Sequence, residues 1–360
     1  MSIKRKIRVL IVDDSALTRK ILTEIFSSDS DIEVIGTARD PYIAREKIKL
    51  LNPDVLTLDV EMPKMNGINF LKNLMRLRPM PVIMVSSLTQ KGADVALEAL
   101  GLGAVDYVGK PDVSNEANLS DYASEIISKV KIAASTHNTN TILQTQRNGK
   151  PQPKNTSLKE SINKNCTQAI VAIGASTGGT EAIKELLCEL QPGAYSVVIV
   201  QHIPKAFSKA FADRVNKISA LEVVEAQDNQ KILPGHAYIA PGDHHLEIIK
   251  KDISYYCRLN DGEPYNRHKP SVDILFNSVS AVAGNDSIGV LLTGMGADGA
   301  YGLKEIQSSG AITIAQDEQS SIVWGMPGEA VKLQAADYVL PLNKITAKLT
   351  KLIQSNAIKP

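Results

Sequence analysis

The sequence predicts two α/β domains, each built on a mainly parallel sheet and joined by a polar linker. Short apolar runs alternate with amphipathic helical patterns in both halves of the chain. Between the halves, from about residue 128 to 165, hydrophobic periodicity is lost and Ser, Thr, Asn, Gln and Lys predominate. Such a composition cannot bury enough apolar surface to offset its ordering entropy. We therefore expect domains over 7–125 and 166–356 and a flexible linker over 126–165.

Composition excludes several classes of protein. The 360 residues are 43% hydrophobic and 22% charged, which is ordinary for a soluble globular protein. A net charge of +1 leaves no electrostatic footprint for a nucleic-acid partner. The first apolar run is short and ends in Asp13 and Asp14, so we expect no signal peptide and no membrane insertion. The three cysteines share no metal or redox spacing, which favours a cytoplasmic protein.

Apolar runs in the first half predict a five-stranded, doubly wound sheet of the flavodoxin-like type. The runs cover residues 8–12, 34–37, 55–58, 82–85 and 104–108, and helical patterns such as 15–27 and 93–100 lie between them. In sheets of this kind, ligands bind at the carboxyl ends of the strands.

Acidic residues collect at that edge. The first strand ends in Asp13 and Asp14 and the third in Asp59, while Ser86 follows the fourth strand and Lys110 the fifth. Converging carboxylates repel one another and need a cation, and oxygen ligands suit Mg²⁺. A hydroxyl and an ammonium beside them suit phosphoryl oxygens, so the pattern predicts metal-assisted phosphorylation of an aspartate. A single aspartate is more often a cap or turn residue, but the whole set favours the functional interpretation.

These segments resemble the receiver domain of two-component response regulators. The matching motifs are VLIVDD at 9–14, LDVEMPKMNG at 58–67, VSS at 85–87 and GKP at 109–111. The resemblance implies that Asp59 is the phosphoacceptor and that a chemotaxis histidine kinase is the phosphodonor. It implies a Mg²⁺ site made by Asp13, Asp14, Asp59 and the backbone carbonyl of Glu61.

The same resemblance assigns three further positions. Ser86 and Lys110 would contact the phosphoryl group, and Tyr107 would occupy the aromatic switch position of the last strand.

A serine turn opens the second half. Residues 171–179, VAIGASTGG, are typical of a short strand, a Gly-x-Ser-x-Gly turn at Ser176 and the start of a helix. Such a turn exposes the hydroxyl beside the N–H groups of the helix, as a nucleophile for acyl chemistry requires. The same spacing could cradle a phosphate. A dinucleotide site would need an acidic residue after the next strand, but Gln201 and His202 stand there, which disfavours nucleotide binding.

Two more polar residues are predicted at the same sheet edge. His202 follows the strand over 196–200, and Asp298 follows the strand over 287–292. If these strands are parallel in one sheet, Ser176, His202 and Asp298 all lie at its carboxyl edge and supply a nucleophile, a base and an orienting acid. Taken singly, each has a structural alternative: a helix cap for Ser176, a structural role for His202 and the N-cap of the next helix for Asp298.

The remaining histidines carry no metal-site pattern. Surface or substrate-facing positions are expected for His236, His244, His245 and His268.

The second half resembles the catalytic domain of the CheB family of chemotaxis protein-glutamate methylesterases. The matching motifs lie at 174–179, 201–204, 240–242, 266–273 and 292–300. The resemblance implies a doubly wound, mainly parallel domain that hydrolyses glutamate γ-methyl esters on methyl-accepting chemotaxis receptors and deamidates receptor glutamines. It implies Ser176 as nucleophile, His202 as general base and acid, Asp298 as orienting acid, and no cofactor for the esterase.

The resemblance also implies an oxyanion site. The backbone N–H of Met295 would contribute to it, with Thr177 beside the nucleophile. The alternative is a response regulator without enzyme activity whose second domain only binds a partner. A DNA-binding output is disfavoured by the net charge of +1 and by the lack of a helix-turn-helix pattern.

Overall fold

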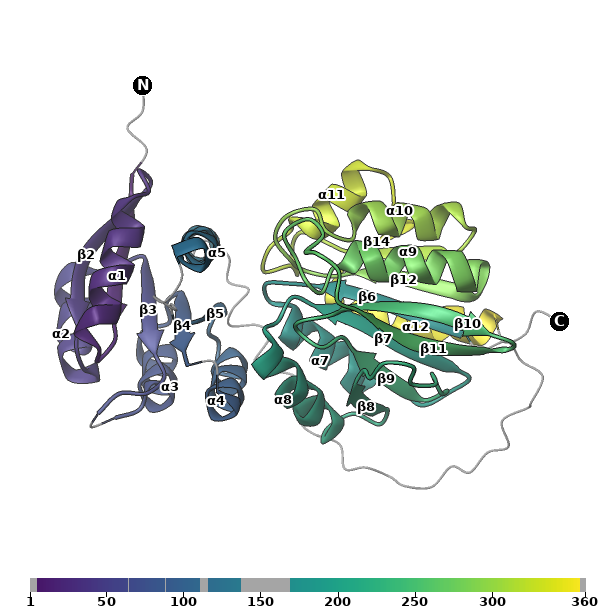
Figure 1. The fold of residues 1–360 in the computed structure, drawn as a ribbon. Coiled ribbons are helices and arrows are strands. Elements are labelled where there is room, and N and C mark those ends of the chain that lie inside the picture. Colours follow the sequence, from purple (N-terminus) through teal and green to yellow (C-terminus); the bar gives the residue numbers. More distant parts are fainter. Residues whose placement is uncertain (1–4, 64, 88, 111–115, 137–168, 357–360) are drawn as a thin grey trace. The chain divides into compact units, whose positions relative to one another are not determined.

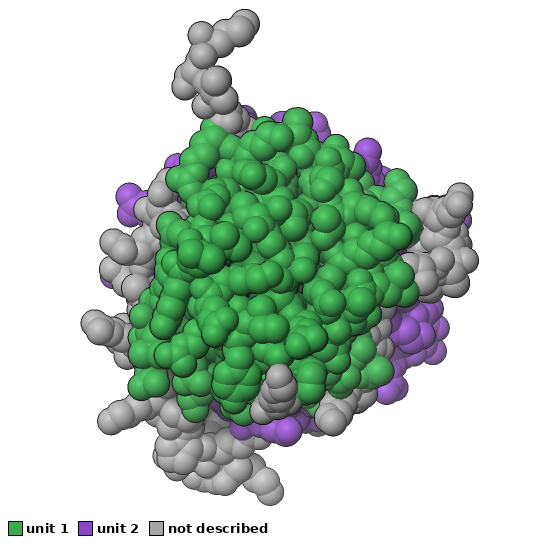
Figure 2. Space-filling model, turned by 90° about the vertical axis from the view of Figure 1, so that its left-hand side faces the viewer, with its two compact units in different colours: residues 1–149 green, residues 150–360 purple. Residues whose placement is uncertain are grey.

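The computed structural model describes residues 5–63, 65–87, 89–110, 116–136 and 169–356 (Figure 1). The chain divides into two compact units, residues 1–149 and residues 150–360, which are coloured separately in Figure 2. They are called the N-terminal and C-terminal units below. Among the helices of the described residues, none is both long enough and apolar enough to cross a membrane.

The N-terminal unit contains one five-stranded parallel sheet in the order β2-β1-β3-β4-β5, which confirms the flavodoxin-like prediction (Figure 1). Its strands are β1 (Ile7–Val12), β2 (Ile32–Ala38), β3 (Val55–Asp59), β4 (Val82–Ser86) and β5 (Asp106–Gly109). Its helices are α1 (Ala16–Ser27), α2 (Pro41–Leu51), α3 (Gly67–Leu77), α4 (Gln90–Gly101) and α5 (Glu116–Thr136).

Helix starts in this unit are fixed by polar side chains. Ser15, Asp40, Asn66 and Thr89 each accept a hydrogen bond from a backbone N–H in the first turn of the helix that follows. These bonds satisfy N–H groups that have no partner inside a helix. The chain therefore turns at the carboxyl edge of the sheet within a few residues, which brings the acidic residues of that edge together.

Helix α5 corrects the predicted linker boundary. The helix continues through Thr136, although the linker was expected to begin at residue 126. Ile126, Val130 and Ala133 recur at helical spacing and are fully buried. The helical pattern of these three apolar residues is hard to recognise in the sequence because Ser and Lys residues surround them. Most of the predicted linker, residues 137–165, lies outside the described residues.

The C-terminal unit contains a seven-stranded parallel sheet in the order β14-β13-β12-β6-β7-β9-β8, which confirms the predicted parallel α/β domain (Figure 1). Its strands are β6 (Ala169–Ala175), β7 (Tyr195–Gln201), β8 (Glu222–Glu225), β9 (His236–Ile239), β12 (Ser287–Leu291), β13 (Ile312–Gln316) and β14 (Tyr338–Leu340). A separate antiparallel hairpin, β10 (His245–Lys251) and β11 (Ser254–Asn260), was not anticipated.

Helices of this unit form two groups that pack among themselves, as expected when both faces of a sheet are covered. One group is α7 (Gly179–Glu189), α8 (Lys205–Asn216) and α12 (Leu342–Asn356), and the other is α9 (Val272–Ala283), α10 (Ala300–Ser308) and α11 (Met326–Lys332). Because β6 pairs with β7 on one side and β12 on the other, the chain reverses its winding direction beside β6. Such a switch point is where doubly wound sheets bind their ligands.

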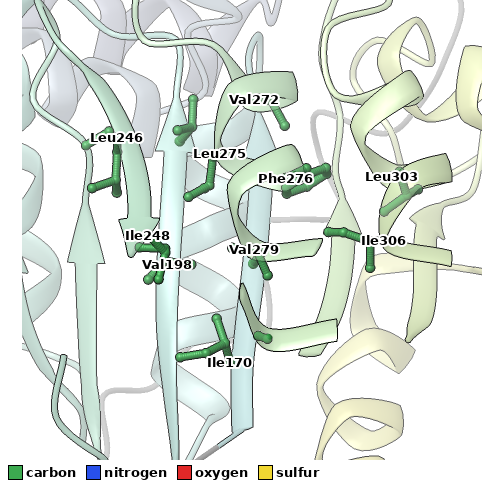
Figure 3. Close-up of a cluster of buried hydrophobic side chains, with 14 of the residues drawn as sticks. Ile170, Val198, Leu246, Ile248, Val272, Leu275, Phe276, Val279, Leu303 and Ile306 are labelled. Carbon is green, nitrogen blue, oxygen red and sulfur yellow. The ribbon is translucent and has the colours of Figure 1, made fainter. Parts of the chain in front are cut away.

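Helix α9 contributes four side chains to a cluster of buried apolar residues in this unit. Figure 3 shows it between β10 and α10. Its buried face repeats at positions typical of a helix, and the members are Val272, Leu275, Phe276 and Val279. Leu246 and Ile248 of the hairpin and Leu303 and Ile306 of α10 belong to the same cluster. The hairpin therefore covers one side of the helix whose first residues reach the sheet edge.

Phe276→Ala should destabilise the C-terminal unit by about 3–5 kcal/mol, because it leaves a cavity against α10. The chain has one tryptophan, Trp324, so its fluorescence in urea follows this unit alone. Ile253→Ala is the control, since Ile253 is 94% exposed. Equal unfolding midpoints for the two variants would contradict the assignment of this core.

Candidate active site

The serine turn has the predicted strand–turn–helix form. Ser176 follows β6, and its backbone N–H donates to the carbonyl of Thr293 (3.0 Å), while its own carbonyl accepts from Gly179 (2.7 Å). Gly178 has φ +78°, a left-handed conformation that side chains disfavour, and α7 begins at the next residue. The predicted nucleophile therefore lies just before the N-terminus of a helix.

His202 lies beside Ser176 because of strand register. Ala175 of β6 and Gln201 of β7 are partners in the parallel ladder, and the N–H of His202 donates to the carbonyl of Ala175 (3.1 Å). Ser176 and His202 are thus the first residues beyond two paired strand ends. The side chain of Gln201 fixes both, since its Nε2 donates to the carbonyls of Ser176 (2.9 Å) and His202 (3.1 Å).

The imidazole of His202 pairs with Asp298 through Nε2, at 2.8 Å from Oδ2. The other ring nitrogen, Nδ1, is buried and has no hydrogen-bond partner among the described residues. In the familiar triad the orienting acid binds Nδ1 and the serine faces Nε2. Here the ring has the reverse orientation, so Nδ1 is the nitrogen left to receive a proton.

Asp298 is fixed by the first turn of α9. Its carboxylate accepts from the hydroxyl of Ser271 (2.7 Å) and from the N–H groups of Val272 (2.8 Å) and Asp273 (3.1 Å). Burial alone would raise the pKa of Asp298, but the hydrogen bond and charge of His202, together with these donors, lower it to about 2. The side chain is therefore a fixed negative charge behind the imidazole.

Asp298 does not cap the helix that follows it, which was the structural alternative to a catalytic role. The helix that follows, α10, has Gly299 as N-cap and no side-chain cap bond. Asp298 instead caps α9, which precedes it in the sequence, while Asp273 of α9 accepts from the N–H of Gly302 in α10 (2.7 Å). The carboxylate of Asp298, just before α10, thus caps α9, and the carboxylate of Asp273 in α9 accepts from the first turn of α10. Burial raises the pKa of Asp273 to about 6, against the hydrogen bond from Gly302.

The loop after β12 contacts the serine turn. A side chain at Gly294 would lie 2.8 Å from Cβ of Ser176, so only glycine allows this approach. Met295 follows and is 41% exposed, whereas Thr177 is buried. Of the two residues predicted for the oxyanion site, Thr177 therefore directly follows Ser176, and Met295 follows the glycine that approaches it.

His268 is partly exposed, in line with the expected surface or substrate-facing position, whereas His245 is buried and differs from that expectation. The ring of His268 stacks on that of His202, with centroids 3.8 Å apart and planes 12° from parallel. His245 is fully buried in β10 and accepts from the N–H of Ser271 (3.1 Å) at Nδ1. His268 and Ser271 lie in the motif over 266–273, but the sequence carries no signal of which motif residue reaches the triad.

The second polar cluster lies at the carboxyl edge of the N-terminal sheet. The Nζ of Lys110 is 2.8 Å from Oδ2 of Asp59 and 3.4 Å from Oδ2 of Asp13. Asp13, Asp14 and Asp59 each offer an oxygen within 4.8 Å of the others. The structure therefore brings together the predicted phosphoacceptor, the two other acidic residues and the predicted lysine.

This acidic cluster fits a divalent cation. Burial raises the pKa of Asp59 to about 6, despite the opposing hydrogen bond from Lys110. Burial also raises the pKa of Asp13, whose Oδ2 has the 3.4 Å ion pair with Lys110 but no hydrogen-bond partner among the described residues. One lysine does not neutralise the negative charge of two buried carboxylates. Oxygen-rich sites of this kind suit Mg²⁺.

Three predicted residues lie around the cluster in different ways. Glu61 donates its backbone N–H to Oδ1 of Asp59 (3.1 Å). Ser86 follows the register partner of Asp59 on β4, but its hydroxyl donates to the carbonyls of Gly92 (3.3 Å) and Ser87 (3.4 Å). Tyr107 is buried in β5. Their proposed roles toward a phosphoryl group remain predictions.

Comparison with known proteins gives the same division of the chain. Residues 9–120 match the family model of the response regulator receiver domain, and residues 171–349 match that of the CheB methylesterase. A protein-glutamate methylesterase/protein-glutamine glutaminase of Hydrogenovibrio crunogenus is 54% identical over 97% of this chain and 99% of its own length. One from Xanthomonas euvesicatoria is 53% identical over 98% and 99%.

Among solved structures, the CheB methylesterase catalytic domain of Thermotoga maritima is 36% identical, with a TM-score of 0.49, and covers 51% of this chain and 98% of that one. A receiver unit and a CheB methylesterase unit in one chain define a hydrolase that carries its own response-regulator domain. The chain belongs to the protein-glutamate methylesterase/protein-glutamine glutaminase family.

Asp59→Asn should stabilise the N-terminal unit at pH 7 in EDTA. The pKa of Asp59 is about 6 in the folded unit and about 3.9 in an unfolded chain. The folded unit therefore binds the proton more tightly, and its stability falls as the pH rises from about 4 to about 6. Removing the carboxylate should therefore raise the free energy of unfolding at pH 7 by about 1–3 kcal/mol and change it little near pH 4. The slowest-exchanging amides of β1 and β3 should show this increase as stronger protection.

Hydrogen exchange of the full chain measures this effect. Asp94→Asn is the matched control, because Asp94 is an exposed carboxylate on α4. Weaker protection of Asp59→Asn at pH 7 would show that burial does not disfavour the Asp59 carboxylate.

Proposed function

We propose that this protein hydrolyses glutamate γ-methyl esters on methyl-accepting chemotaxis receptors and deamidates receptor glutamines, under the control of Asp59 phosphorylation. The observation that carries the proposal is the placement of Ser176 and His202 at paired strand ends, with Asp298 behind the imidazole. The names of the related proteins state both activities. We further propose that the protein works in the cytoplasm.

The proposed reaction begins with attack of the Ser176 hydroxyl on the ester carbonyl. Nδ1 of His202 takes the hydroxyl proton and gives it to the methoxy oxygen as the ester C–O bond breaks, so that methanol leaves and an acyl-enzyme remains. A water molecule then attacks, with His202 again as base, and regenerates glutamate and Ser176. Asp298 stabilises the imidazolium without itself taking the proton, in agreement with its low pKa of about 2. Deamidation follows the same steps with ammonia as leaving group.

The oxyanion of the tetrahedral intermediate needs fixed donors. We assign this role to the backbone N–H groups of Met295, which follows Gly294, and of Thr177, which follows Ser176. Gly294 supports the assignment, since its contact with Ser176 holds the loop against the nucleophile. Such donors are worth about 3–4 kcal/mol each in enzymes where they have been removed. No cofactor is required for these steps.

Control is assigned to the N-terminal unit. Asp13, Asp14, Asp59 and the backbone carbonyl of Glu61 would hold Mg²⁺, which when bound neutralises charge on a transferring phosphoryl group. Lys110 lies close enough to Asp59 to contact phosphoryl oxygens.

Ser86 and Tyr107 would respond to the phosphorylated state. Ser86 would do so by rotating its hydroxyl away from Gly92, and Tyr107 by changing its packing. The expected phosphodonor is a chemotaxis histidine kinase.

Ser176→Ala should reduce methanol release from methylated receptors by several orders of magnitude, because removal of a triad nucleophile costs about 10⁶ in kcat where measured. Its thermal unfolding should be unchanged. Ser309→Ala is the control, since Ser309 directly follows α10 and its hydroxyl donates to the carbonyl of Ile306 in that helix. A fully active Ser176→Ala enzyme would exclude the acyl-enzyme mechanism.

Acetyl phosphate with Mg²⁺ should add one base-labile phosphate and raise the rate of methanol release. Asp59→Asn should show neither effect, and EDTA should prevent both, because the carboxylate and the metal site are required. Mass spectrometry and the methanol assay measure the two outcomes, with Asp94→Asn as control. Phosphate on a hydroxyl residue would contradict the assignment of Asp59, and unaltered methanol release after phosphorylation would contradict its control of the esterase.

A further inference from the structure

Ser271 lies behind the catalytic acid. Its side chain is fully buried immediately before α9, and its hydroxyl donates to Oδ1 of Asp298 at 2.7 Å. Oδ2 of the same carboxylate receives Nε2 of His202 and the N–H of Val272, each at 2.8 Å. Ser271 and His202 therefore bind opposite oxygens of one carboxylate.

Ser271 is itself held by His245. The N–H of Ser271 donates to Nδ1 of His245 (3.1 Å), so this nitrogen carries no proton. The other nitrogen, Nε2, then donates to the carbonyl of Glu263 (3.0 Å). With both nitrogens engaged and no exposed surface, His245 is locked as one neutral tautomer. His245 of β10 therefore holds the backbone of Ser271 in place, and the serine hydroxyl bonds to Asp298 from that position.

We propose that Ser271 is a positioning residue that sets how strongly Asp298 attracts the imidazolium of His202. A hydroxyl that donates to a carboxylate draws negative charge toward itself, which leaves less charge for the other partner. Without this donor, Asp298 would attract the proton on His202 more strongly. The imidazole would then be protonated up to a higher pH and would be a poorer acceptor for the serine proton near neutrality.

Other titratable groups face this pair from each described element packed against it. His268 stacks on His202, Asp273 of α9 lies next to Asp298, and His245 of β10 is one hydrogen bond further away. The Ser271 hydroxyl bonds to none of these three groups, so removing it changes the pair through Asp298.

The test follows the ring of His202 by NMR in the full chain labelled with ¹³C-histidine, with the signal assigned by its loss in His202→Gln. Ser271→Ala should raise the pH midpoint of this signal by roughly half a unit or more, as expected for a lost charge-assisted hydrogen bond. Ser271→Cys, which keeps a weak donor of similar shape, should give an intermediate shift. Ser287→Ala should give none, since Ser287 bonds to the carbonyl of Gly284 at the start of β12.

The same variants give a kinetic readout, which rests on the proposed function. The acid limb of kcat/KM for methanol release should move to higher pH in the order wild type, Ser271→Cys, Ser271→Ala. The NMR titration needs no substrate, so inactivity toward receptors would overturn the proposed function and leave this inference standing. An unchanged or lowered His202 midpoint in folded Ser271→Ala or Ser271→Cys would overturn the inference.

Discussion

Four hydrogen bonds converge on the carboxylate of Asp298, and both the core and the site of the C-terminal unit depend on them. Three come from Ser271 and the first N–H groups of α9, and one comes from His202. The same helix buries Phe276 and its neighbours between the hairpin and α10. Packing of α9 therefore fixes the donors that hold the acid, and the acid in turn satisfies the buried start of the helix.

The two units place buried carboxylates in opposite electrostatic surroundings. Asp298 has backbone donors and an imidazole around it, and its pKa is lowered to about 2. Asp59 is buried beside a second acidic residue with one lysine between them, and its pKa is raised to about 6. The first suits a permanent charge that orients a ring, whereas the second suits a group whose charge changes when a cation or phosphoryl group arrives.

Sequence patterns predicted those parts of the site that follow from parallel strands alone. Ser176, His202 and Asp59 stand directly after apolar runs, and the carboxyl ends of parallel strands share one edge. The link from Asp298 to α9 could not be found this way, because it joins residues that are distant in the chain through helix packing. The same limit applies to His245, whose burial depends on the unanticipated hairpin, and to α5, whose apolar stripe is sparse.

The reversed imidazole of His202 bears on the size of the leaving group. Nδ1 adjoins the ring carbon that carries the side-chain stem, whereas Nε2, at the free end of the ring, is occupied by Asp298. In the proposed mechanism, a leaving group that takes its proton from Nδ1 would therefore depart close to the main chain of His202, directly after β7. Under the proposed mechanism, that position would favour small leaving groups such as methanol and ammonia over bulky alcohols, and relative hydrolysis rates of methyl and benzyl esters would measure this selectivity.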